Sequence, residues 1–154
     1  ADMGKEMAAR YCGEGVTKVL TIESSGISLA YAVALELAVP MVFARRRKTI
    51  TTEEDVWCVR VPSFTKGMVT DLVIARRFLT ADDHVLFVDD IIANGNGAKG
   101  MMKIIEQSGA RLVGLAVAVE KTFQEGADSL RKQGIRVESL AKLKSLADGK
   151  IILE

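Results

Sequence analysis

The feature that most constrains the fold is a pattern that occurs twice along the chain. A short apolar run is followed by a turn of small residues, a helical stretch and a second apolar run. In the first copy, residues 16–22 are β-branched and apolar with little alternation, which is typical of a strand covered on both faces. Residues 27–38 predict a helix packed on a sheet, and residues 40–44 predict the next strand. A βαβ unit of this kind has parallel strands and a right-handed crossover.

The second copy of the pattern is the clearer one. It consists of a strand at residues 85–88, a glycine-rich turn at 94–97, a helix at 98–107 closed by Gly109, and a strand at 112–119. Beyond it, the sequence predicts a helix at 125–133, a strand at 136–140 after Gly134, and a short edge strand at 150–153. Two βαβ units predict an α/β fold, in which a doubly wound, mostly parallel sheet is flanked by helices.

Residues 45–80 depart from this alternation of strand and helix. They hold a Thr- and Glu-rich stretch at 49–55, two alternating runs around Trp57 and Val73, and a basic cluster made of Arg45, Arg46, Arg47 and Lys48. A period of two is typical of strands with one solvent-facing side. We therefore predict an antiparallel excursion from the main sheet, part of which forms a flap.

Composition limits the functions open to the chain. Its 154 residues are 49% hydrophobic, which fits a single domain over residues 1–154 with a sizeable core. The formal net charge is only +1, so we expect neither nucleic acid nor a membrane surface as a partner. Cys12 and Cys58 lack the spacing of a disulfide framework or a zinc site, and the apolar run at 112–119 is too short to cross a bilayer. We expect a soluble, cytoplasmic protein that acts on small molecules.

The strongest chemical signal follows the strand at residues 85–88. Asp89 and Asp90 come at its carboxyl end, where open α/β sheets bind ligands, and carboxylates there suit the hydroxyl groups of a sugar. The next residues form a glycine-rich turn that leads into a helix: Ala93, Asn94, Gly95, Asn96 and Gly97. Backbone N–H groups and the helix dipole converge on an anion at such a point, which predicts a ribose-phosphate site. The alternative is a tight turn, with the two acids capping the ends of the strand and helix.

Three other groups of residues have two open interpretations each. The loop of Glu23, Ser24, Ser25 and Gly26 precedes a helix, and either faces an anion or forms an ordinary N-cap. The basic cluster at residues 45–48 either meets an anionic ligand or is a solvated face. Aromatic side chains such as Trp57 and Phe64 are more often core or subunit contacts than base-stacking groups. We assign no role to His84, which lies in a turn before a strand.

Residues 89–95 follow an apolar strand and consist of two acids, two apolar residues, a small residue and a glycine-containing turn. This pattern resembles the phosphoribosyl pyrophosphate motif of type I phosphoribosyltransferases. Further segments resemble the bacterial xanthine branch of that family: residues 22–27, 40–45, 63–66, 120–124 and 136–141. The resemblance extends over essentially the whole chain. It implies the type I phosphoribosyltransferase fold and a purine-salvage reaction in which phosphoribosyl pyrophosphate and xanthine give xanthosine 5′-monophosphate and pyrophosphate.

The resemblance also implies roles for individual residues. Residues 93–97 would bind the 5′-phosphate, residues 23–26 would face pyrophosphate, and Asp89 and Asp90 would address the ribose hydroxyls directly or through Mg²⁺. Lys121 would read the exocyclic oxygen of an oxopurine, because an aminopurine would present a donor to a donor. Without the resemblance, Lys121 is interpreted as a solvated lysine at a strand end. Relatives in the family also suggest a homodimer.

Two departures from the family pattern bear on the base. Many purine phosphoribosyltransferases carry an Asp three residues after the acid pair to help take the purine proton, and here that residue is Ala93. Xanthine is acidic enough to react as an anion, so its use is compatible with this loss. The chain starts at Ala1 rather than Met, in a helical pattern, so we expect a shortened N-terminus that lacks a hood segment for the base. Guanine or hypoxanthine transfer, and a non-catalytic regulator that senses phosphoribosyl pyrophosphate, are the alternative functions.

Overall fold

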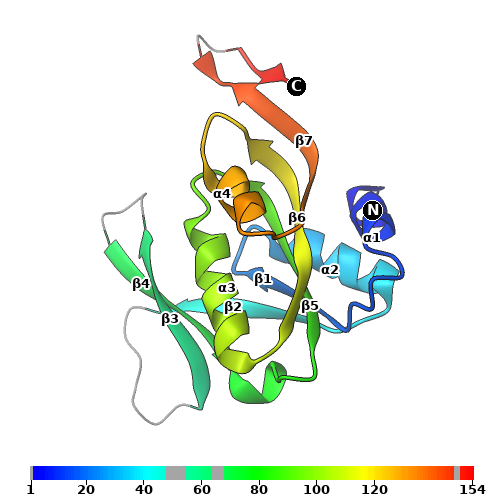
Figure 1. Cartoon of the computed structure of the whole chain (residues 1–154), viewed down its shortest axis with the longest axis vertical. Helices are drawn as coiled ribbons and strands as arrows, with labels where there is room; N and C mark the ends of the chain where they lie inside the picture. The colour runs from blue at the N-terminus through cyan, green and yellow to red at the C-terminus, as the bar shows by residue number, and fades with distance from the viewer. Residues whose placement is uncertain (1, 48–54, 64–67, 148–149) are drawn as a thin grey trace.

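The computed structural model describes residues 2–47, 55–63, 68–147 and 150–154 (Figure 1). Within these residues, eight strands form one sheet in the order β3-β4-β2-β1-β5-β6-β7-β8. The strands are β1 (Lys18–Ile22), β2 (Met41–Arg47), β3 (Val56–Ser63), β4 (Met68–Ala75), β5 (His84–Ile92), β6 (Arg111–Lys121), β7 (Val137–Ser145) and β8 (Ile152–Leu153). The helices are α1 (Asp2–Arg10), α2 (Ile27–Leu37), α3 (Asn96–Ser108) and α4 (Gly126–Lys132), with a short 3-10 turn, η1 (Arg76–Phe78). The sheet is mixed, because β2-β1-β5-β6-β7 run parallel while β3, β4 and β8 pair antiparallel.

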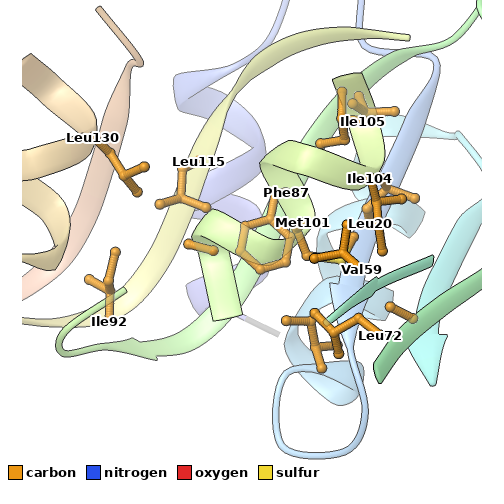
Figure 2. Close-up of a cluster of buried hydrophobic side chains, with 14 of the residues drawn as sticks. Leu20, Val59, Leu72, Phe87, Ile92, Met101, Ile104, Ile105, Leu115 and Leu130 are labelled. Carbon is orange, nitrogen blue, oxygen red and sulfur yellow. The ribbon is translucent and has the colours of Figure 1, made fainter. Parts of the chain in front are cut away.

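Helices cover the parallel part of the sheet on both faces. Because successive side chains of a strand point to opposite faces, each buried strand feeds two separate cores. Leu20, Phe87 and Leu115 pack with residues of α3 and α4, as Figure 2 shows, whereas their neighbours Val19, Leu86 and Ala116 pack with residues of α1 and α2. The near-continuous apolar runs of the sequence therefore reflect burial on both sides, and the predicted doubly wound, mostly parallel fold is confirmed.

The central strands are longer than the sequence indicated. The strand predicted at residues 85–88 continues as β5 to Ile92, so Asp89 and Asp90 lie within it rather than after it. The reason is that its pairing with β6 continues past the acids, for example between Asp89 and Val117 and between Ile92 and Glu120. A backbone ladder of this kind holds polar residues in extended form when a partner strand is present.

The antiparallel pairing predicted within residues 45–80 is confirmed for the described residues, and it is continuous with the main sheet. Arg45, Arg46 and Arg47 continue β2 and pair antiparallel with Val73, Leu72 and Asp71 of β4, and β3 then pairs along the whole of β4. Apolar residues of β3 and β4 complete the core beneath α3. Trp57 belongs to this edge, since its Nε1–H donates to the Leu79 carbonyl at 2.9 Å and the Arg76 guanidinium lies 4.2 Å from its ring centre. The predictions at Lys48, at 49–54 and at Phe64 lie outside the described residues.

The remaining elements match their predicted positions within a few residues. α2 ends at Leu37, with Ala38 in the left-handed region, and α3 ends at Ser108 before Gly109, as the C-terminal glycine predicted. β7 reaches Ser145, beyond the predicted end at 140, because it pairs with β6 as far as Leu143 and then with β8. Among the helices that the structure describes, none combines the length and apolar character required to traverse a bilayer.

Candidate active site

The carboxyl ends of β1, β5 and β6 meet at one edge of the sheet because these strands are parallel. A cavity of about 250 Å³ opens there, between the ends of β1 and β5 and the start of α3. Its lining includes most of the residues predicted for a ribose-phosphate site: Glu23, Ser25, Asp89, Asp90, Ala93, Asn94, Gly95, Asn96 and Gly97. Segments separated by more than sixty residues in the sequence are therefore brought together at the predicted place.

The acid pair occupies the wall of this cavity. The backbone N–H of Asp90 donates to the Asp89 carboxylate at 2.9 Å, and the N–H of Ile91 donates to the Asp90 carboxylate at 2.9 Å. Burial raises the pKa of Asp89 to about 7, the neighbouring Asp90 adds to this shift, and the positive charge of Arg46 acts against it. Positive charge or hydroxyl donors brought next to Asp89 by a ligand would favour its ionised form.

The glycine turn (residues 93–97) joins β5 to α3. Gly95 has φ +79°, in the left-handed region that L side chains rarely adopt, and the Asn94 side chain accepts a hydrogen bond from the Asn96 N–H at 3.2 Å. The tight turn that Asn94 and Gly95 predict is thus present. The N-cap residue of α3 is Gly95, which has no side chain to cap the helix, and the Asn94 side chain takes only the N–H of Asn96. The N–H groups of the residues that follow can therefore meet an anion at the end of the cavity.

The loop of residues 23–26 faces the glycine turn across the cavity. Ser25 is exposed and lines the cavity, while Ser24 is exposed outside it. Gly26 is buried against the acid pair, since a Cβ atom there would collide with Thr21 Oγ1 and lie 3.0 Å from Asp89 Oδ1. The alternative of an ordinary side-chain N-cap does not describe this loop, because Gly26 is the N-cap of α2 and no side-chain hydrogen bond caps that helix among the described residues.

Arg46 lines the cavity, so for this residue of the basic cluster the structure favours the interpretation of contact with an anionic ligand over that of a solvated face. It is exposed, and its guanidinium lies 4.0 Å from the point where a Cβ atom on Gly97 would stand. Its backbone N–H donates to the Glu23 carboxylate at 2.5 Å, which joins β2 to the loop of residues 23–26. Arg45 and Arg47 line a different, largely apolar cavity. The period of two along β2 was the signal that separates Arg46 from its neighbours.

Lys121 is the last residue of β6, where it pairs with Leu143 of β7. Its half-buried side chain is not part of the cavity lining. The preceding residue, Glu120, is opposite Ile92 at the end of β5, so Lys121 lies at the same edge of the sheet as the glycine turn. The structure therefore places Lys121 at the edge of the sheet where the cavity opens, but Ser24, Gly26 and Lys121 are not among the residues that line it.

Comparison with known proteins agrees with this geometry. A model of the phosphoribosyl transferase domain family matches residues 4–135. Xanthine phosphoribosyltransferase of Moorella thermoacetica is 49% identical over 149 residues, which cover 97% of this chain and 76% of that protein. Xanthine phosphoribosyltransferase of Bacillus mycoides is 45% identical over 150 residues, with the same two coverages.

Solved structures of related enzymes share the fold. The adenine phosphoribosyltransferase of Giardia lamblia, complexed with 9-deazaadenine, aligns with a TM-score of 0.82 and 27% identity over 93% of this chain and 78% of that one. The enzyme of Rhodothermus marinus aligns with a TM-score of 0.78 and 23% identity over 92% and 77%, a likeness of fold alone. With the family model matching residues 4–135 and relatives close to half identical, the chain belongs to the phosphoribosyltransferase family.

Proposed function

We propose that this protein transfers the 5-phosphoribosyl group of phosphoribosyl pyrophosphate to xanthine, which gives xanthosine 5′-monophosphate and pyrophosphate. The observation that carries the proposal is the cavity in which the acid pair, the glycine turn and the start of α3 converge. Relatives that are 45–49% identical and named xanthine phosphoribosyltransferases support the choice of base.

The chemistry of the transfer explains why these residue types suit the site. The bond from the anomeric carbon to pyrophosphate weakens as the bond to the purine nitrogen forms, so the sugar becomes cation-like while negative charge grows on the leaving group. Asp89 and Asp90 hold the ribose hydroxyls, and their negative charge favours a cationic sugar. Backbone N–H groups of the glycine turn hold the 5′-phosphate, and we assign the hydroxyl of Ser25 and the guanidinium of Arg46, which also line the cavity, to the pyrophosphate.

The acid pair is suited to Mg²⁺ if phosphoribosyl pyrophosphate supplies the remaining ligands of the ion. Mg²⁺ usually takes one or two carboxylates and finds its other ligands among phosphate oxygens and water. The described residues include no cluster of three or more His, Cys, Asp or Glu side chains that would hold a metal alone, but Asp89 and Asp90 adjoin the cavity. When bound, the ion would offset the charge of the pyrophosphate group, and these two carboxylates are the residues we propose to hold it.

Recognition of the base is assigned to Lys121. Its ammonium group donates to the exocyclic oxygen of an oxopurine and has no acceptor to offer an amino group. Ala93 leaves the start of the glycine turn without a carboxylate that would take the purine proton. Xanthine, which ionises more readily than guanine or hypoxanthine, depends least on such a base, and this supports its choice over those two purines.

We further propose a cytoplasmic homodimer. Cys12 and Cys58 are both free thiols, which suits a reducing compartment. Phe43 and Phe78 are exposed by 39% and 45% and line the apolar cavity beside β2 and β4, and side chains of this size are often buried where subunits meet. Light scattering of the purified chain should give twice the mass of one chain, and a monomer at micromolar concentration would contradict the homodimer.

The decisive experiment is a spectrophotometric assay of the purified chain with phosphoribosyl pyrophosphate and Mg²⁺. Xanthine, guanine and hypoxanthine are supplied in turn, and kcat/KM is compared among the three. We expect xanthine to be preferred. A preference for guanine or hypoxanthine would contradict the choice of base, and binding of phosphoribosyl pyrophosphate without turnover of any purine would favour a sensor of that ligand.

A further inference from the structure

The first residue of helix α4, Gly126, contacts the backbone of the glycine turn. The N–H of Gly126 donates to the carbonyl of Ala93 at 3.0 Å. A Cβ atom on Gly126 would collide with that carbonyl oxygen and lie 2.7 Å from the nitrogen of Gly95 and 2.8 Å from the carbonyl carbon of Asn94. Because these neighbours are backbone atoms that cannot rotate away, only glycine permits the contact.

The other end of α4 is tied to β6. Two nitrogens of the Arg131 guanidinium donate to the two carboxylate oxygens of Glu120, at 2.6 and 2.7 Å. The Glu120 side chain is 3% exposed, and it also accepts a hydrogen bond from the Ser139 hydroxyl. Arg131 donates in addition to the carbonyl of Val137 at 3.3 Å, so β7 shares the attachment. A bidentate pair with a buried carboxylate has a well-defined geometry, because both partners are planar.

The middle of α4 packs into the core beneath the cavity. Ala127 and Leu130 are buried, and they belong to the same apolar cluster as Ile92, Ala98 and Leu115. Figure 2 shows Leu130 beside Leu115. The helix therefore contacts the glycine turn at one end, the core in its middle and the end of β6 at the other, and Glu120 in β6 directly precedes Lys121.

We propose that α4 is a brace that sets the position of the glycine turn relative to the strand end that carries Lys121, with Gly126 and Arg131 as its positioning residues. Neither residue lines the cavity, so both act through the elements that they hold. The inference rests on the proposed function, which assigns the glycine turn to the 5′-phosphate and Lys121 to the purine. It adds that one short helix fixes the position of the 5′-phosphate site relative to the purine site, so that one transfer can use both.

The first test compares two buried helical glycines in the full chain. In Gly126→Ala the new methyl group meets the backbone of the glycine turn, whereas in Gly4→Ala it meets α2, where a Cβ atom would lie 2.6 Å from Ala32 Cβ. Ribose 5-phosphate binding is measured by calorimetry alongside thermal unfolding. We expect Gly126→Ala to lose at least about tenfold in affinity, since small displacements of a binding group are costly, and Gly4→Ala to bind as the unchanged chain does.

Two results would overturn the brace: wild-type affinity in a folded Gly126→Ala protein, or an equal loss of affinity in Gly4→Ala. If Gly126→Ala does not fold, the double variant Glu120→Gln with Arg131→Met replaces it, because it removes the bidentate pair without leaving a charge unpaired. We expect this variant to unfold cooperatively and to bind ribose 5-phosphate more weakly than the unchanged chain. Unchanged affinity would again overturn the inference.

The same experiment separates the brace from the proposed function. Ribose 5-phosphate binding needs no turnover. A chain that binds ribose 5-phosphate but forms no nucleotide from any purine would disprove the proposed transfer, and the comparison of variants by their affinity would still test the brace. If xanthine is turned over, the change in the KM for phosphoribosyl pyrophosphate compared with the change in kcat gives a second readout. A brace predicts that Gly126→Ala raises the KM for phosphoribosyl pyrophosphate more than it lowers kcat, and equal kcat loss at unchanged KM would contradict it.

Discussion

Replacement of Gly95 by alanine tests whether the conformation of the glycine turn determines ligand affinity. Gly95 has φ +79°, and a Cβ atom there would lie 3.0 Å from the Cα of Gly126. Left-handed backbone costs an L residue about 1–2 kcal/mol, and crowding against a neighbour that cannot rotate costs about 1–3 kcal/mol more. Gly13 provides a matched control, because its φ is +81° and nothing lies within 4 Å of the position of a Cβ atom.

The two variants should therefore differ in binding more than in stability. We expect Gly13→Ala to lower the melting temperature by about 2–8 °C, at roughly 2–4 °C for each kcal/mol in a chain of this size, and to leave the KM for phosphoribosyl pyrophosphate unchanged. If about 2 kcal/mol of strain in Gly95→Ala is relieved by moving the turn out of its binding geometry, that KM rises about 30-fold. Steady-state kinetics and calorimetry with ribose 5-phosphate measure the effect. An unchanged KM in Gly95→Ala, or an equal rise in Gly13→Ala, would refute the reasoning.

Three further changes probe the acid pair, the base and the buried ion pair. Asp90→Asn should abolish most of the transfer while leaving the melting temperature close to that of the unchanged chain, and full turnover would remove Asp90 from the site. Lys121→Ala should raise the KM for xanthine far more than that for phosphoribosyl pyrophosphate, whereas equal changes would indicate a structural lysine. Burial by itself would raise the pKa of Glu120, but hydrogen bonds from Arg131 and Ser139 outweigh burial and lower that pKa. The ion pair of Glu120 with Arg131 therefore stabilises the fold above the ordinary pKa of glutamic acid, and this stabilisation is lost as the pH falls through the lower folded-state pKa. Arg131→Met should therefore lower the free energy of unfolding in urea by about 3–5 kcal/mol at pH 7, because it leaves a buried carboxylate unpaired. The loss should be smaller at pH 4, and an equal loss at both pH values would contradict this account.

The order of the elements could be predicted because its signals are local. A strand buried on both faces needs a continuous apolar run, and a left-handed turn needs glycine, so both can be recognised within a few residues of sequence. Asp89, Asp90 and the glycine turn were found in this way, and the structure places them around one cavity. The ends of the strands were less predictable. β5 continues through the acids only because β6 pairs with it, and that pairing is invisible in residues 84–92 themselves.

Contacts between distant segments required the tertiary structure. Arg46 was one of four basic residues in a row, and only the structure shows that β2 continues through it, so that alternation along the strand places Arg46 at the cavity and Arg45 and Arg47 on the other side. The antiparallel strands β3 and β4 were predicted from their alternation, but alternation does not reveal which edge of the sheet a strand joins, and only the structure shows that they extend the edge at β2.

The sequence by itself determined the class of fold, the strand and turn that carry the acid pair, and the resemblance to phosphoribosyltransferases, because periodicity and turn chemistry are properties of neighbouring residues. Only the tertiary structure decided that Gly126 lies against the glycine turn and that Arg131 holds Glu120. Nothing local distinguishes Gly126 from other glycines near a helix start. Its role depends on a backbone 31 to 33 residues earlier in the chain, brought within contact distance by the packing of α4 on the sheet.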